Sequence, residues 1–97
     1  MALSYEETAN LMRDATFINR IKIACLVYMH EIMNEPYETP AHVTRLKWAQ
    51  SVSQTPDSVA MQLAPIVVMD PAIQAAGANV TDSDLQVAVV GAINKML

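Results

Sequence analysis

FINRIKIACLVYMHEIM, residues 17–33, is the stretch of sequence that decides the fold. It is long enough for a helix, and its apolar residues recur at helical spacing. At that spacing they form one continuous stripe, which we expect to face the core: Phe17, Ile21, Ala24, Cys25, Tyr28 and Ile32, broadened by Ile18 and Met29. Polar side chains lie on the opposite side. The segment therefore predicts a long, central helix in an all-α protein.

Ile23 and Val27 interrupt the polar side of this helix, one turn apart. A helix that is apolar on two sides is either central in its bundle or covered by a partner. Because 97 residues leave few helices to cover both sides, we expect Ile23 and Val27 to meet another chain. Arg20 and Glu31 would then form a polar rim around the contact. If both apolar residues are core instead, the helix is simply central.

The last predicted helix has the same double character. Its core stripe consists of Leu85, Val89, Ala92, Ile93 and Met96. Val87 and Val90 point away from that stripe, and the seven Met residues of the chain add adaptable contact surface. Together with Arg45, discussed below, these residues make up the predicted interface: Arg20, Ile23, Val27, Glu31, Arg45, Val87 and Val90.

Capping residues mark the helix starts. Ser4 and Glu7 form a capping-box pattern that opens a short helix ending near residue 13. Asp14 or Thr16 begins the long helix, which ends near residue 34. Thr39-Pro40, Thr55-Pro56 and Asp70-Pro71 each place a capping side chain before a proline at the first helical position, opening helices over 40–54, 56–68 and 71–76. Thr81 or Asp82 begins the last helix, which runs to about residue 96.

Two further residues refine these boundaries. Pro65 should kink or shorten the helix over 56–68, because proline lacks the backbone N–H. Gly77 suits the position just past the helix over 71–76. No strand-like alternation extends beyond three or four residues. The sequence therefore predicts a compact, all-α bundle of four to five helices with short loops, forming a single domain over residues 1–97.

Composition supports helices and argues against several kinds of partner. The chain is 53% hydrophobic, has only 5% aromatic residues and contains two Gly. Its net charge is −4, and no Lys, Arg or His occurs between Trp48 and Asn94. Binding to nucleic acid or to an anionic membrane surface needs clustered cations, so we expect neither partner.

The sequence also gives little support for catalysis. His30-Glu31 resembles the start of a zinc-protease helix, but Asn34 stands where the second His would be. Asp82-Ser83-Asp84 lacks the Gly and the distal Glu of a calcium loop. Cys25 lies on the most apolar side of its helix, where a thiol is usually inert. We expect no catalytic, metal-binding or cofactor-binding residues, and hence no enzyme.

The location of the protein follows from what the chain lacks. Cys25 is the only cysteine, so no internal disulfide can form. The first residues carry acids where a signal peptide needs cations and an apolar core. The longest uncharged stretch, residues 58–69, is too short to span a bilayer and contains Pro65. We therefore expect an intracellular, soluble protein.

Arg45 is an unusual residue on the helix over 40–54. Ala41, Leu46, Trp48, Ala49 and Val52 share one broad side of this helix, and His42 and Arg45 fall within it. In one interpretation, the stem of Arg45 packs beside Trp48 and its head pairs with an acid of the same chain. In the other, Arg45 forms a salt bridge between subunits or stacks on Trp48. The sequence leaves both open.

Four short patterns occur in order along the whole chain: Phe17-x-Asn19-Arg20-Ile21-x-x-Ala24, His42-x-x-Arg45-x-x-Trp48-Ala49, Pro56-Asp57 and Thr81-Asp82-Ser83-Asp84-Leu85-Gln86-x-x-Val89. Together they resemble small proteins of tailed bacteriophages that are encoded among virion-assembly genes. The resemblance implies a structural component of the virion, assembled in the host cytoplasm. It carries over no catalytic residues.

The expected function is therefore protein–protein contact in a phage particle, with copies of the same chain and with other virion proteins. By analogy with helical adaptor domains, we favour the head–tail connector, or neck, region. A capsid decoration or cement protein is the nearest alternative. A small, non-viral helical adaptor or regulatory protein would use the same apolar surface.

Overall fold

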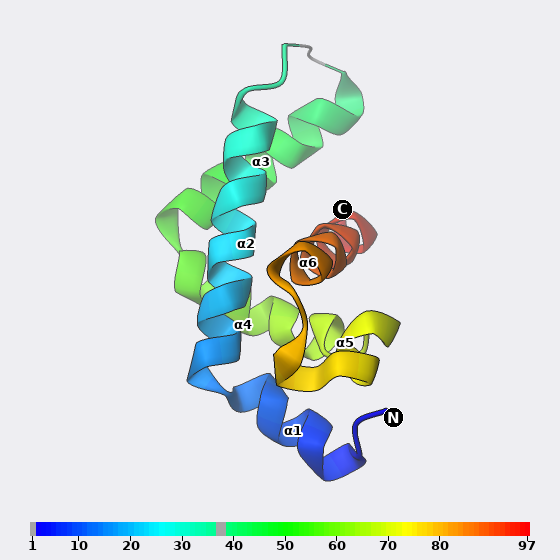
Figure 1. Ribbon diagram of the computed structural model, residues 1–97. Helices are drawn as coiled ribbons and strands as arrows, with labels where there is room; N and C mark the ends of the chain where they lie inside the picture. The colour runs from blue at the N-terminus through cyan, green and yellow to red at the C-terminus, as the bar shows by residue number, and fades with distance from the viewer. Residues whose placement is uncertain (1, 37–38) are drawn as a thin grey trace.

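Helix α2 (Ala15–Met33) runs along the long axis of the molecule, and the other helices pack around it (Figure 1). The computed structural model describes residues 2–36 and 39–97. The principal extents are 42 × 22 × 19 Å. Helices α1, α3, α4 and α6 all contact α2 directly, so the long helix is the centre of the bundle.

The described residues form six α-helices, one 3-10 helix and no strand, which confirms the all-α class. The predicted number of four to five helices was too low, although each of the six ranges predicted from the capping residues does form a helix. Asp14 takes an extended backbone between α1 and α2. The other helices are α1 (Tyr5–Arg13), α3 (Pro40–Gln54), α4 (Pro56–Val67), α5 (Pro71–Ala76), the 3-10 helix η1 (Gly77–Asn79) and α6 (Asp82–Met96).

Side-chain caps explain most of the helix starts. The Ser4 hydroxyl accepts a hydrogen bond from the backbone N–H of Glu7, whose carboxylate accepts one from the Ser4 N–H, completing the predicted capping box. Asp14, rather than Thr16, caps α2 by accepting from the Phe17 N–H. Thr39 and Thr81 cap α3 and α6 in the same way, and Asp70 caps α5 by accepting from the N–H two residues ahead.

Thr55 precedes α4 at the predicted position, but its side chain does not cap that helix, and this part of the prediction was wrong. Its hydroxyl donates a hydrogen bond to the Ser51 carbonyl, one turn back in α3. The backbone of Thr55 (φ −135°, ψ 59°) differs from the extended backbone that lets Thr39 (φ −111°, ψ 165°) bond forward. The Thr55 hydroxyl therefore serves the end of α3, while the Thr55 carbonyl accepts the first hydrogen bond of α4 from the Val59 N–H.

Pro65 and Gly77 both lie close to the end of a helix, as predicted. Pro65 lies inside α4, which ends two residues later at Val67. Gly77 ends α5 with φ 59°, a backbone conformation that favours glycine. A Cβ at Gly77 would also lie 3.1 Å from Leu3, so the N-terminal segment packs tightly here. The Leu3 N–H donates to the Gln74 carbonyl and ties this segment to α5.

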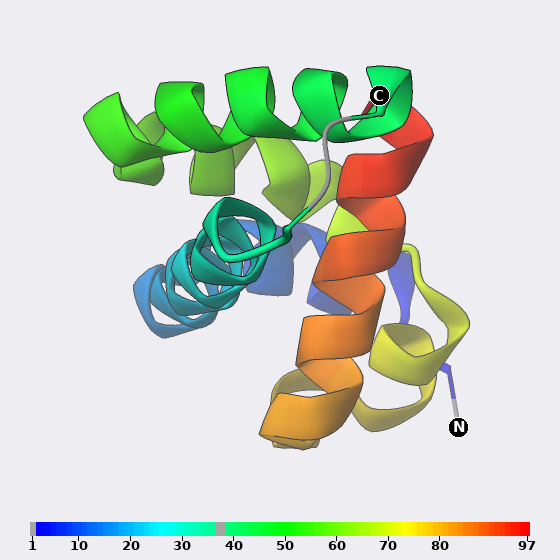
Figure 2. The same ribbon diagram turned by 90° about the horizontal axis from the view of Figure 1, so that it is seen from above.

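The core lies on the predicted side of α2. All six residues of the principal stripe are buried, and so is Met29, while Ile18 is half-buried. Figure 2 shows α3 and α6 on different sides of α2, with α6 crossing it steeply. On α6, Leu85, Val89, Ala92 and Ile93 are buried as predicted. Met96 is 50% exposed, against the prediction, because it is the last residue of the helix.

Replacing Thr39 by Ala should lower the free energy of unfolding by about 0.5–2 kcal/mol, since the α3 cap is lost. Thr55→Ala should cost less, because its hydroxyl caps no helix start. Urea denaturation followed by circular dichroism checks both values. Equal losses of unfolding free energy at the two sites would contradict the assignment of the Thr55 hydroxyl to the end of α3.

Candidate interaction surface

The outer side of α2 carries the two apolar residues that the sequence singled out. Ile23 is 52% exposed and Val27 is 43% exposed, although both are large aliphatic side chains. Neither belongs to the core, so the alternative that they are buried by the bundle itself was wrong. Single exposed apolar residues are common on protein surfaces, so the surroundings of the pair decide its significance.

A groove of about 330 Å³ lies beside this pair, between α2 and the N-terminal half of α6. Ile23 and Val27 form one wall, and the buried residues Ala24 and Leu85 lie deeper in it. Gln86 forms part of the opposite wall and donates a hydrogen bond to the Ala24 carbonyl across the groove (3.2 Å). Exposed apolar walls beside a hollow are the features of a protein-contact site.

Arg20 closes one end of the groove. Its guanidinium donates to the carbonyls of Ala78 (3.2 Å) and Val80 (2.7 Å) and to the carboxylate of Asp82 (2.9 Å). These bonds fasten the segment between η1 and α6 onto α2. Arg20 therefore has a structural role within the chain, which the predicted rim position did not anticipate. Its acceptors lie about sixty residues away, and no local pattern signals them.

The remaining predicted interface residues are dispersed. Glu31 is exposed on α2, and Val87 on α6 is 72% exposed. Val90 is half-buried and packs against the core. It lies on α6 between Gln86 and Asn94, and Asn94 accepts a hydrogen bond from the Tyr28 hydroxyl of α2 (3.2 Å). Val90 thus faces α2 more than Val87 does. Of these two valines, Val87 is the one whose side chain a partner could cover.

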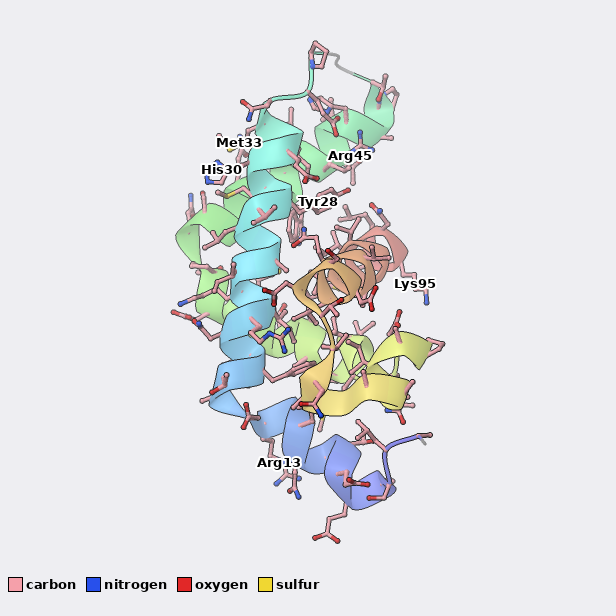
Figure 3. The ribbon with its side chains drawn as sticks, in the orientation of Figure 1. Arg13, Tyr28, His30, Met33, Arg45 and Lys95 are labelled. Atoms are coloured by element: carbon pink, nitrogen blue, oxygen red, sulfur yellow. The ribbon has the colours of Figure 1, made fainter. Side chains whose placement is uncertain are left out.

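Arg45 lies on α3, near the C-terminal end of α2 and far from Arg20. It pairs with an acid of the same chain, as one of the two interpretations predicts. It donates to the Glu35 carboxylate at 2.9 Å, and the same oxygen lies 2.6 Å from Nδ1 of His42. His42 is 4% exposed, and its ring ties the end of α2 to the start of α3. Figure 3 shows Arg45 on α3 beside the upper end of α2.

Trp48 stacks on an aromatic ring rather than on Arg45. The ring centroids of Tyr28 and Trp48 are 5.7 Å apart and tilted by 46°. This contact joins α2 to α3 below the group formed by Glu35, His42 and Arg45, which we call the Glu35 cluster. The two features together hold α3 against α2 at the end of the molecule where the chain connects the two helices.

Two electrostatic effects follow from this geometry. The Arg45 guanidinium and, secondarily, the His42 ring lower the pKa of the Glu35 carboxyl. Burial in the α2 core stripe raises the pKa of the Cys25 thiol to about 12. A thiol with such a pKa is protonated at neutral pH and is a poor nucleophile. Cys25 therefore serves the core, as predicted from its position on the helix.

A second, larger groove of about 430 Å³ was missed by the sequence analysis. It lies between α1 and the segment where α4 meets α5, and apolar residues dominate its lining: Leu3, Tyr5, Ala9, Met12, Pro65, Val68 and Met69, with Thr8 and Gln74. The exposed Tyr5 and Met69 were the available signal. Its boundaries come from three separate elements, so helical spacing within any one of them could not reveal it.

Residues 2–36 and 39–97 contain no group of three or more His, Cys, Asp or Glu side chains that could hold a metal ion. No single helix there is long and apolar enough to cross a membrane. Helix α4 taken with Pro71–Asn79 reaches the required length and composition only as a pair bent by 80°.

Comparison of the chain with models of protein families, with curated proteins and with solved structures found no match.

The Glu35 cluster predicts a pH-dependent contribution to stability. Because the pKa of Glu35 is lowered in the folded protein, its contribution is complete above its ordinary pKa of about 4.5 and is lost as the pH falls through the lowered value. Glu35→Gln should therefore destabilise the protein at pH 5, and the difference from wild type should shrink towards pH 3. Denaturant unfolding at both pH values measures it. Glu31→Gln, which changes an exposed acid in the last turn of α2, is the control; an equal effect there would refute the assignment.

Cys25 should not react with a thiol reagent in the native protein at pH 8, because the thiol is buried and protonated. It should react fully in denaturant. Spectrophotometric titration with a disulfide reagent checks this, and rapid labelling of the folded protein would contradict the core position.

Proposed function

We propose that the protein is a structural component of a tailed-bacteriophage virion and acts through protein–protein contacts. The observation that carries the binding role is the exposure of Ile23 and Val27 beside the groove between α2 and α6. Exposed aliphatic residues on the wall of a hollow gain free energy when a partner covers them, about 1.5–3 kcal/mol for a fully buried Val or Ile.

The composition of the surface also favours binding over catalysis. Arg20 and Asp82 form an ion pair at the end of the groove, so a partner would meet an apolar centre bordered by charges. This is the usual anatomy of a protein interface. The buried, protonated thiol of Cys25 and the paired side chains of Glu35 and His42 are occupied in holding the fold.

The assignment to a phage particle rests on the resemblance of the four sequence patterns. Within those patterns, Arg20 holds the start of α6, and Asp82 accepts its bond. Phe17, Ile21, Ala24, Ala49, Leu85 and Val89 are buried. Most residues of the four patterns that we have placed hold the fold together, which supports a fold related to that of the phage proteins. The choice of partner would depend on the exposed residues instead.

Within the particle we propose the head–tail connector region, by analogy with helical adaptor domains. A position on the capsid surface is the alternative. Antibody labelling of purified particles in the electron microscope separates them: label confined to the neck supports the connector, and label spread over the head supports decoration. Absence of the protein from purified particles, measured by mass spectrometry, would contradict both positions.

The double variant Ile23→Ser/Val27→Ser should fold but fail to enter particles when it is supplied in place of the wild-type chain. Both side chains are exposed, so their loss should change the free energy of unfolding little. Met33→Ser is the matched control, because Met33 is also exposed on α2 but does not line the groove. Quantitative mass spectrometry of particles measures incorporation. Equal incorporation of the two variants would show that another surface makes the contact.

A further inference from the structure

The exposed side of α6 has a shape and a charge pattern that fit a second copy of itself. Asp84, Val87, Gly91 and Asn94 follow one another at steps of three and four residues, so they share one side of the helix. All four are exposed. Helix α2 covers α6 on the side of Gln86 and also reaches Asn94, which accepts the hydrogen bond from the Tyr28 hydroxyl. Helices α4 and α5 lie beyond Ala88 and Ala92, so Asp84, Val87 and Gly91 stay exposed between these neighbours.

The centre of this side combines a projection with a notch. Val87 is 72% exposed and stands out from the helix. One turn further on, a Cβ built on Gly91 would meet nothing within 4 Å, so there is open space next to the helix backbone. A groove of about 410 Å³ continues from Gly91 towards α4, lined there by Ile66 and Met69.

The ends of the same side carry opposite charges. Asp84 lies in the first turn of α6, and Lys95 lies in the last turn. Neither forms an ion pair with another of the described residues. Figure 3 shows Lys95 projecting outward from α6, at the edge of the groove that α6 forms with α4 and the start of α5. The helix therefore has an acidic end, an apolar centre with a notch and a basic end, in that order.

We propose that α6 pairs with α6 of a second copy in an antiparallel, two-fold arrangement. With the two-fold axis level with Val89, Val87 of each copy lies opposite Gly91 of the other and enters the space beside it. Asp84 of each copy lies opposite Asn94 of the other, next to Lys95. Both contacts occur twice, because a two-fold interface uses the same patch on both molecules. A parallel pair would place like charges together and Val87 against Val87.

This pairing deepens the proposed function by naming a self-contact, but it concerns the purified chain alone and does not require the virion assignment. It uses the side of α6 turned away from the α2 groove. Loss of particle incorporation in Ile23→Ser/Val27→Ser and loss of pairing in α6 variants are therefore separate results, and either can fail while the other holds.

Sedimentation velocity of the purified chain over a range of concentrations tests the pairing. A single helix pair lies at the small end of specific interfaces, so we expect a concentration-dependent dimer. Gly91→Leu should fill the notch and weaken the dimer about tenfold or more. The added side chain meets open space in the monomer, so the thermal midpoint should not fall. Gln50→Leu, at an exposed position of α3, is the matched control and should leave the dimer unchanged.

A charge exchange tests the orientation. Asp84→Lys should weaken the dimer by placing cations together, and adding Lys95→Asp should restore it. Both changes oppose the dipole of α6, so restored pairing cannot arise from a more stable helix. A chain that stays monomeric at all concentrations, or a dimer that is insensitive to Gly91→Leu, would overturn the proposal. So would a charge exchange that fails to restore pairing while the double variant remains folded by circular dichroism.

Discussion

The burial of one side of α2 is the constraint on which the rest of the structure depends. Phe17, Ile21 and Ile32 are almost completely enclosed, and each contributes about 1.5–3 kcal/mol when buried. No single short helix can cover a stripe that runs the length of α2. Helices α1, α3, α4 and α6 therefore divide the task along its length, which is why the molecule is elongated and why α2 is its centre.

Polar contacts then determine which helix lies against which part of α2. Arg20 fixes the start of α6 against the N-terminal half of α2, the lower half in Figure 1, and the Tyr28 hydroxyl bonds to Asn94 further along both helices. Glu35 and its two partners hold α3 at the upper end. Apolar burial is not directional, so these few hydrogen-bonded positions supply the specificity of the arrangement. With these sides occupied, Ile23 and Val27 are left on the uncovered side of α2.

The sequence predicted features that depend on near neighbours and missed those that depend on distant ones. The capping box at Ser4, the cap at Thr39 and the stop at Gly77 are local, and each was found from a few adjacent residues. Thr55 shows the limit of that method, since the same Thr-Pro pattern bonds backwards once its backbone leaves the extended region. The surface could be predicted only in part. Helical spacing identified Ile23 and Val27 as lying off the core stripe, but it could not show the groove that α6 forms beside them.

The contacts between α2 and α6 also bear on when the protein can fold in the cell. The carbonyls that accept from Arg20 lie 58 and 60 residues further along the chain, and Asn94 lies 66 residues beyond Tyr28. A ribosome releases α2 before it has made α6, so the apolar side of α2 towards α6 stays open until α6 emerges. Loop closure over such separations raises the contact order and slows folding relative to a bundle with only local contacts. The nascent chain therefore keeps part of its core stripe exposed until α6 emerges, and the native core is completed only when α6 packs against α2.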